Sequence, residues 1–221
     1  MATQFTREKQ IVLGAAPLRT GSGFLGALIH HENLLTAMHY LGLAASGKPY
    51  MGVGRNLAYT RSAYNAVNGF SSHHHIPAGD DDLFVQEAAN ANNTAICVNP
   101  DAFCYSDGPA TWSAYWKQKK RHLWVGKSYQ KGVKQLLSIY PMAQLFFWIT
   151  ILLWFFFGSQ ILWPILAMIL KLTPEWIVFH QKGKLLQMRR STTLYPVFNL
   201  FESFWYVLTG INAFFTKKIT W

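Results

Sequence analysis

The feature that most constrains this chain is a long apolar block that follows directly on a basic segment. Residues 136–170 are almost entirely apolar, and a helix needs roughly 20 such residues to cross the hydrocarbon core of a bilayer. Seven lysines and arginines lie between Lys117 and Lys134, and no acidic residue occurs between Gly108 and Pro174. Basic residues beside an apolar span are typical of the cytoplasmic face of a membrane. We therefore expect a membrane region that is preceded by a cytoplasmic segment.

The apolar block divides the chain into three parts. The first reads as globular sequence with helix-like and strand-like stretches, the second as a transmembrane hairpin, and the third as a cytoplasmic or interfacial amphipathic tail. These parts cover residues 1–135, 136–180 and 181–221. We therefore expect an α/β fold followed by a helical membrane region, as a multi-pass protein of the inner, cytoplasmic membrane.

A polar turn, Gly158-Ser159-Gln160, interrupts the apolar block. The block is too long for one untilted span and marginal for two, and we expect hairpin members at about 141–158 and 161–179. Further basic residues then place the next segment on the same side as the first basic run, namely Lys182, Lys184, Arg189 and Arg190. Residues 194–215 are apolar again but contain Asn199 and Glu202, and they precede Lys217-Lys218. They predict a surface-lying or re-entrant helix, with a third span as the alternative.

Periodicity and turn residues predict the elements of the globular part. The segment from Tyr50 to Tyr59 alternates Gly52 and Gly54 with larger residues, which suits a strand that another group approaches closely. The strands expected are 11–14, 50–59 and 94–98, and the helices are 24–45, 61–67, 83–90 and one from 112 onward.

Three consecutive carboxylates, Asp80, Asp81 and Asp82, stand in a chain that has only 10 acidic residues against 20 basic ones. Neighbouring like charges raise the cost of ionising one another, so such a cluster indicates a catalytic base or a cation-binding loop. The structural alternative is an acidic cap on the helix expected from Leu83 onward, because aspartate is favoured at helix N-termini. Asp82 suits that capping role best.

The histidines and cysteines of the chain do not have the spacing of a metal-binding site. His73, His74 and His75 are consecutive, so they cannot all face one ion, and we favour a loop histidine that titrates or binds phosphate. His31 and Glu32 point to different sides of their helix, which argues against a ligand pair. The two cysteines lack metal-type spacing and read as structural thiols. We therefore assign no metal ligand.

Aromatic and basic residues interleave at helical spacing from Trp112 to His122. Such a face suits stacking and pairing with a nucleotide diphosphate or a sugar. The alternative is an interfacial helix whose tryptophans and lysines lie at the lipid headgroups. The two interpretations are compatible.

Taken together, these residues resemble the C-terminal part of a membrane-bound family-2 glycosyltransferase, an inverting superfamily with a GT-A type fold. The run from Asp80 to Leu83 resembles the E-D-x-D-L block of that family, with Gly79 at the glutamate position. The segment from Gln118 to His122 resembles its Q-x-x-R-W motif, with His122 in place of tryptophan. Upstream, Gly54–Tyr59 and Gly69-Phe70 resemble the segment that precedes the acidic block. The likeness covers roughly residues 50–180.

The resemblance implies a partial GT-A catalytic domain with hexosyltransferase-type activity of the kind that builds cell-envelope polysaccharide. A sugar would pass from a nucleotide-sugar donor to a lipid or glycan acceptor at the cytoplasmic membrane face. By register with the family, Asp80 is the best candidate for the general base and Asp81 the next. The resemblance implies substrate contacts for Asp82, Gly54, Arg55, Asn56, Trp116, Gln118, Arg121 and His122.

The resemblance also implies a divalent cation, Mg²⁺ or Mn²⁺, held with the donor phosphates by a D-x-D motif in an N-terminal nucleotide-binding half. The only D-x-D in this chain is Asp80–Asp82, which occupies the position of a different motif. We therefore expect a chain that is truncated at its N-terminus and inactive on its own.

Two other classes of function remain to be weighed. A non-catalytic membrane-anchored protein could use the basic segment to bind anionic lipid or a partner. A nucleic-acid binder is disfavoured, because the basic run adjoins apolar sequence of membrane length.

Overall fold

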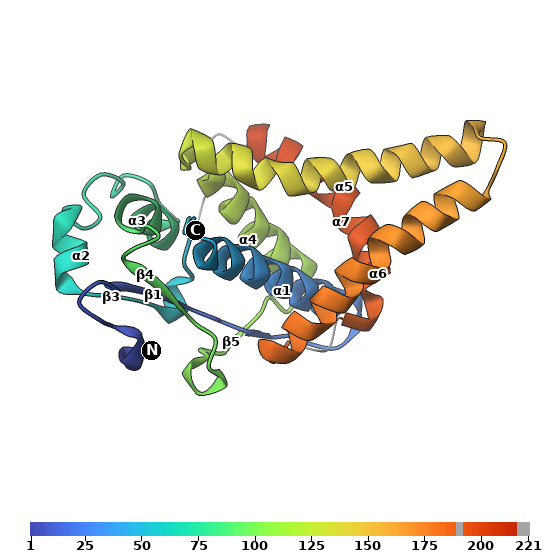
Figure 1. Ribbon diagram of the computed structural model, residues 1–221. Coiled ribbons are helices and arrows are strands. Elements are labelled where there is room, and N and C mark those ends of the chain that lie inside the picture. Colours follow the sequence, from blue (N-terminus) through green and yellow to red (C-terminus); the bar gives the residue numbers. More distant parts are fainter. Residues whose placement is uncertain (189–191, 216–221) are drawn as a thin grey trace.

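We describe residues 1–188 and 192–215 of a computed structural model of the protein, and their side chains as far as residue 210. A small mixed sheet lies at one side of the molecule (Figure 1). Its central strand β1 (Ile11–Gly14) pairs antiparallel with β3 (Leu57–Tyr59) and parallel with β4 (Thr94–Cys97). Ile11, Val12 and Leu13 are fully buried, which explains why this strand is a continuous apolar run.

The long helix α1 (Gly23–Ala45) packs against this sheet and forms the centre of the core. Tyr40 fixes the contact, because its hydroxyl donates a 2.7 Å hydrogen bond to the carbonyl of Gly14 at the end of β1. Phe179 and Leu186, from the far end of the chain, are buried in the same core cluster. The membrane-type helices therefore share a hydrophobic core with the sheet.

Shorter elements complete the globular part. Two small helices, α2 (Arg61–Ala66) and α3 (Asp80–Ala88), lie beside the sheet, and the 3-10 turn η2 (Gly54–Asn56) precedes β3. The strands β2 (Leu18–Arg19) and β5 (Ser106–Asp107) form a second, two-stranded parallel sheet. The helix α4 (Trp112–Val125) follows β5.

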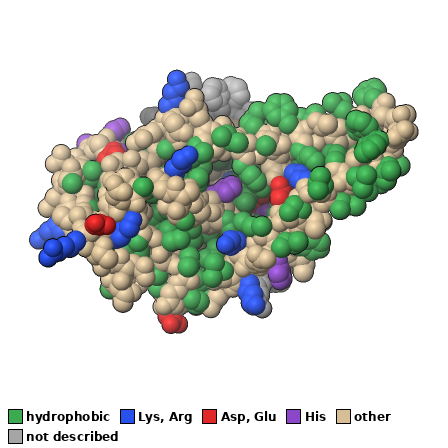
Figure 2. Space-filling view, in the orientation of Figure 1, with side chains coloured by type: hydrophobic (Ala, Val, Ile, Leu, Met, Phe, Trp, Pro, Cys, Tyr) green, Lys and Arg blue, Asp and Glu red, His purple; other side chains and the backbone are tan. Residues whose placement is uncertain are grey.

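Two long helices, α5 (Lys131–Phe157) and α6 (Leu162–Leu185), form a hairpin that projects away from the sheet (Figure 1). By length and composition, both are apolar enough to cross a membrane. Apolar side chains cover much of the projecting arm (Figure 2), and Phe156, Phe157 and Leu170 are 80%, 85% and 79% exposed. The helix α7 (Tyr195–Phe215) packs against α4 and α5 at the base of this arm.

Most expected elements are confirmed, but three boundaries were wrong. Only Leu57–Tyr59 of the expected strand 50–59 is a strand, because Gly54–Asn56 turns to bond with other segments. The helix expected from Leu83 begins at Asp80. The hairpin helix expected at about 141–158 begins earlier, at Lys131, since its polar first turns continue without a break into the apolar block. Of the predicted tail, Arg189, Arg190, Lys217 and Lys218 lie outside the described residues.

Candidate active site

The acidic turn at the start of α3 depends on a glycine. Gly79 is the N-cap residue and has φ +78°, in the left-handed region that favours glycine. A Cβ at this position would lie 2.2 Å from Cγ1 of Val125, at the end of α4. The chain can therefore turn sharply into α3 against α4, which places all three aspartates in the first helical turn.

Asp81 is held by the segment before β3. The backbone N–H of Gly54 donates a 2.7 Å hydrogen bond to Oδ2 of Asp81, and the N–H of Asp82 donates a 3.0 Å bond to its Oδ1. Burial raises the pKa of Asp81 above its usual value, although these N–H donors oppose the shift. A carboxylate with a fixed orientation and a raised pKa has the properties of a general base.

Asp82 has a different environment. The hydroxyl of Tyr129, between α4 and α5, donates a hydrogen bond to its Oδ2, and among the described residues its buried Oδ1 has no partner. Burial, followed by the negative charge of Asp81, raises the pKa of Asp82 to about 8. Asp82 is therefore largely protonated at pH 7, which removes most of its repulsion from Asp81. Asp80 is exposed to solvent.

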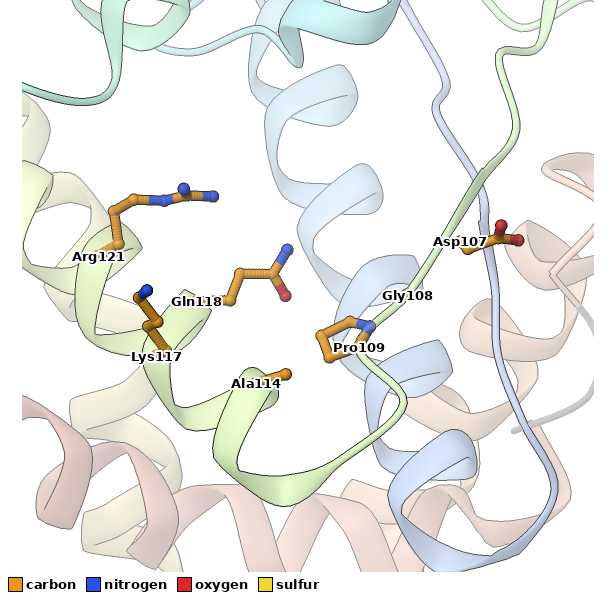
Figure 3. Close-up of a pocket in the computed structure, with 7 residues that line it drawn as sticks. All are labelled: Asp107, Gly108, Pro109, Ala114, Lys117, Gln118 and Arg121. Carbon is orange, nitrogen blue, oxygen red and sulfur yellow. The ribbon is translucent and has the colours of Figure 1, made fainter. Parts of the chain in front are cut away.

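An open cleft of about 370 Å³ lies between α4 and the loop after β5. Gln118 and Arg121 extend from α4 toward the opposite wall (Figure 3). Thr111 caps the N-terminus of α4, because its Oγ1 accepts a 3.2 Å hydrogen bond from the N–H of Ala114. The cleft is lined by Asp107, Gly108, Pro109, Ala114, Lys117, Gln118 and Arg121.

Arg55 and Asn56 join η2 to the two sheets. Arg55 donates to Ser106 Oγ at 2.6 Å and to the carbonyl of Ala16 at 3.0 Å, so its guanidinium lies at β5, one residue from the cleft residue Asp107. Asn56 is 8% exposed, and its Nδ2 donates to the carbonyls of Ala15 and Ala102 at 2.7 and 2.8 Å. This residue holds the loops together.

The other two predicted contact residues on α4 do not line the cleft. Trp116 lies against Trp205 of α7, with ring centroids 5.5 Å apart, and His122 is exposed. Of the predicted set, the structure thus brings Asp81 together with Gly54, and separately brings Gln118 together with Arg121.

The acidic turn and α4 are joined directly. Besides the contact between Gly79 and Val125, Gln130 at the start of α5 binds α3 twice: its N–H donates to Gln86 Oε1 and its Nε2 donates to the Gln86 carbonyl, both at 3.0 Å. The base candidate and the cleft helix are therefore parts of one packed unit.

The described residues do not fit the divalent cation that the resemblance implies. Within residues 1–188 and 192–210, no group of three or more His, Cys, Asp or Glu side chains could hold a metal ion. Asp81 and Asp82 bind protein groups on different segments. His73 is buried, with Nδ1 2.9 Å from Ser72 Oγ and 3.3 Å from Glu87 Oε1, so it packs against α3.

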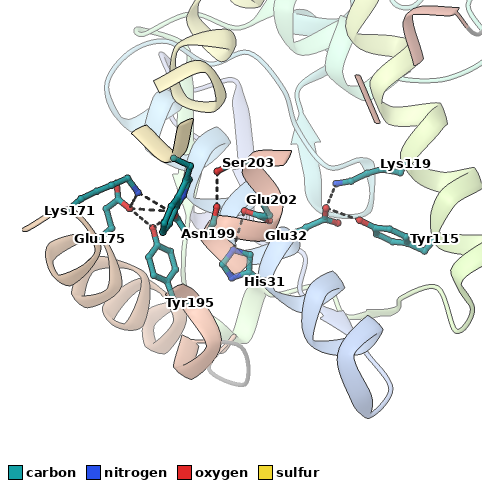
Figure 4. A network of polar contacts seen from close by, with 11 residues as sticks. His31, Glu32, Tyr115, Lys119, Lys171, Glu175, Tyr195, Asn199, Glu202 and Ser203 are labelled. Atoms are coloured by element: carbon teal, nitrogen blue, oxygen red, sulfur yellow. Dashed lines mark hydrogen bonds and ion pairs between the residues drawn. The ribbon is translucent and has the colours of Figure 1, made fainter. Parts of the chain in front are cut away.

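Sequence reasoning missed a buried polar network behind the cleft (Figure 4). Lys119 Nζ lies 2.7 Å from Glu32 Oε1, which also accepts a 2.8 Å bond from the hydroxyl of Tyr115. His31 Nε2 lies 3.2 Å from Glu202 Oε2. The local signal was an acidic residue and a histidine inside the apolar period of α1, because the partners lie far along the chain, at least 83 residues away.

Most of the chain matches one protein family. Residues 10–215 match the family described as Glycosyl transferase family group 2. The matched region contains the sheet, the acidic turn, the cleft and both hairpin helices. A search of curated proteins found no match.

Proposed function

Since the chain belongs to glycosyl transferase family group 2 and is a glycosyltransferase, we propose that it transfers a sugar with inversion from a nucleotide-sugar donor, using Asp81 as the general base. The acceptor is a lipid or glycan hydroxyl at the cytoplasmic membrane face. The single observation that carries the choice of Asp81 is the 2.7 Å hydrogen bond from Gly54 N–H to its carboxylate.

This choice differs from the order that sequence register suggested, in which Asp80 came first. Asp80 is exposed, and water would compete there for an acceptor hydroxyl. Asp81 is partly buried, has a fixed orientation and has a raised pKa. The raised pKa brings this carboxylate closer to the operating pH, which is where a general base is most effective. We assign Asp82 a supporting role, in which its proton keeps a second negative charge away from the base.

In the proposed reaction, the acceptor oxygen attacks the anomeric carbon while Asp81 takes the hydroxyl proton. The bond from that carbon to the donor diphosphate breaks, and the diphosphate leaves with the electron pair. Charge stabilises this leaving group, so no second acid is required. Arg121 and Lys117 supply positive charge at the cleft, and the planar guanidinium of Arg121 suits two phosphate oxygens at once.

We assign donor binding to the cleft between α4 and the loop after β5. Its volume of about 370 Å³ lies within the range of roughly 300–1,000 Å³ for small-molecule sites. Gln118 adds an amide that can donate and accept hydrogen bonds. Asn56 and Trp116 contact protein groups instead, and we assign them structural roles.

The hairpin supports a membrane location. Its helices expose large apolar side chains along the projecting arm. At the tip, Trp154 and Trp163 donate hydrogen bonds to Gln160 at 2.9 and 2.8 Å, which is the kind of amphipathic group found at a membrane interface. Exposed lysines lie near the opposite end, including Lys131 and Lys182, as expected for the cytoplasmic face.

The test is Asp81→Asn in the protein as its gene encodes it, assayed in membranes with a panel of labelled nucleotide sugars. Loss of the base is expected to reduce kcat by 10²–10⁴-fold. Asp80→Asn and the remote Asp101→Asn are matched controls and are expected to retain activity within about threefold of wild type. If Asp80→Asn abolishes transfer while Asp81→Asn does not, the assignment of the base is wrong.

A further inference from the structure

The inner face of α4 carries an ion pair that the proposed chemistry does not use. Lys119 Nζ and the hydroxyl of Tyr115 converge on one oxygen, Oε1 of Glu32, at 2.7 and 2.8 Å. Residues four apart lie on the same face of a helix. One carboxylate on α1 therefore binds two consecutive turns of α4.

This contact is well shielded from water. Glu32 is 6% exposed, and the side chain of Lys119 is 14% exposed. The ammonium group also lies 5.3 Å from the ring centre of Tyr206 on α7. A buried charge that loses its partner is costly, so this geometry strongly favours keeping Lys119 directed at Glu32.

The direction of Lys119 sets the direction of the cleft residues. Successive residues of an α-helix are about 100° apart around the axis, so fixing residue 119 also fixes Gln118 next to it and Arg121 two positions on. Both line the cleft. A small rotation of α4 would move their polar ends away from the opposite wall.

The helix α7 contacts α4 through aromatic rings and one hydrogen bond. Trp205 lies beside Trp116 and Tyr115, with ring centroids 5.5 and 6.4 Å away. Its Nε1 donates a 3.0 Å hydrogen bond to the Tyr115 hydroxyl. The ring contacts are less directional than a charge-assisted hydrogen bond. The directional bonds on this face of α4 converge on the Tyr115 hydroxyl and the Glu32 carboxylate.

We propose that Glu32 is a positioning residue, which pairs with Lys119 to fix the rotation of α4 and thereby the direction in which Gln118 and Arg121 face the cleft. The proposal rests on the function proposed above, because it assumes that these two residues bind substrate. Glu32 acts through α4 and does not itself touch the substrate.

The experiment measures kcat and KM for the nucleotide-sugar donor in membranes. Glu32→Gln keeps the size of the side chain and an acceptor oxygen, but it leaves the Lys119 ammonium without its counter-charge. We expect KM to rise about tenfold, a size within the range measured for coupled buried groups, with kcat changed by less than about threefold. The double variant Glu32→Gln with Lys119→Gln removes the stranded charge without restoring the ion pair, so KM is expected to stay raised. Recovery of KM to the wild-type value in the double variant would show that the stranded charge, and not lost positioning, caused the effect.

The matched control is His31→Gln. His31 is the residue next to Glu32 on α1, and this change breaks its buried pair with Glu202 of α7. No residue of α4 belongs to that pair. A similar loss of thermal stability with an unchanged KM is expected. The proposal is overturned if Glu32→Gln leaves KM within twofold of wild type, or if His31→Gln raises KM equally.

A reference variant separates this idea from the proposed function. Gln118→Ala should raise the donor KM directly. If Gln118→Ala has no effect, the substrate-binding role of the cleft fails. If Gln118→Ala raises KM while Glu32→Gln does not, only the positioning role fails.

Discussion

The backbone N–H of Gly54 and the carboxylate of Asp81 lie 2.7 Å apart and join two segments separated by 27 residues. The bond orients one carboxylate of three. It also explains why a glycine stands at position 54, because a Cβ there would lie 3.2 Å from the same carboxylate oxygen. The acidic run is therefore more than a helix cap, since Gly54 in the segment before β3 binds and orients Asp81.

Gly54→Ala should lower activity with little effect on folding. The added Cβ would press against Oδ2 of Asp81, and the carboxylate would have to move by a few tenths of an ångström. Misplacing a catalytic group by about 1 Å can cost 10²-fold, so we expect kcat to fall about tenfold. Gly42→Ala is the control, because its Cβ would meet nothing within 4 Å. Full activity in Gly54→Ala would contradict the role of this contact.

Gly79→Ala should destabilise the fold. The left-handed backbone costs about 1–2 kcal/mol with a Cβ, and the clash with Val125 adds about 1–3 kcal/mol of overpacking. Thermal unfolding of the single variant and of Gly79→Ala with Val125→Ala separates these costs. The double variant should be more stable than the sum of the two single changes predicts. Simple additivity would refute the contact.

The raised pKa of Asp82 predicts how stability depends on pH. Its pKa is about 8 in the folded protein against an ordinary value of 3.8, so the folded state binds the extra proton between these values. The stability that this proton supplies is full below about pH 4 and is lost as the pH rises through 8. Per proton, the change is at most about 1.4 kcal/mol per pH unit.

Asp82→Asn isolates this effect, because asparagine keeps an acceptor for Tyr129 and does not ionise. Denaturant unfolding of both proteins at pH 5 to 8 should show the variant gaining stability relative to wild type as the pH rises. A constant difference between the two proteins would show that Asp82 titrates normally.

Arg121→Lys should weaken donor binding while keeping the charge. Arginine can bind two phosphate oxygens through its planar fork, whereas lysine acts as a point charge. We expect the donor KM and the inhibition constant of the free nucleoside diphosphate to rise together, about tenfold. Trp116→Phe is the control on the other face of α4, and equal effects from both variants would count against the cleft as the donor site.

A charge at the hairpin tip should oppose membrane insertion. Phe156 and Phe157 are the most exposed aromatic residues of the arm among the described residues. The tip must pass through the hydrocarbon core to reach the far interface, and an aspartate costs up to about 2.5–3.5 kcal/mol at the centre of that core. Phe156→Asp with Phe157→Asp should shift protein from the floating membrane fraction to the soluble or aggregated fraction in a flotation assay. Phe156→Leu with Phe157→Leu should float like wild type. If the aspartate variant also floats fully, the tip does not lie in lipid.

The sequence by itself determined the features that are local. The apolar runs of α5 and α6 and the polar turn at Gly158 required no partner to be recognised, and α1 and α4 followed from their periods. The family also followed from short motifs, since residues 10–215 match it. These features can be predicted from the sequence because hydrophobic periodicity and backbone propensity depend on residues that are close together in the chain.

Tertiary structure decided which of those residues meet. Nothing near Asp81 in the chain shows that Gly54 will orient it, and nothing near Glu32 shows that Lys119 and Tyr115 will converge on it. The helix α3 can start at Asp80 only because Gly79 has no side chain to clash with Val125, a residue that is distant in the chain. Burial is the physical reason, because it makes the pairing of distant polar groups obligatory and shifts their pKa values. Burial exists only once the helices have packed.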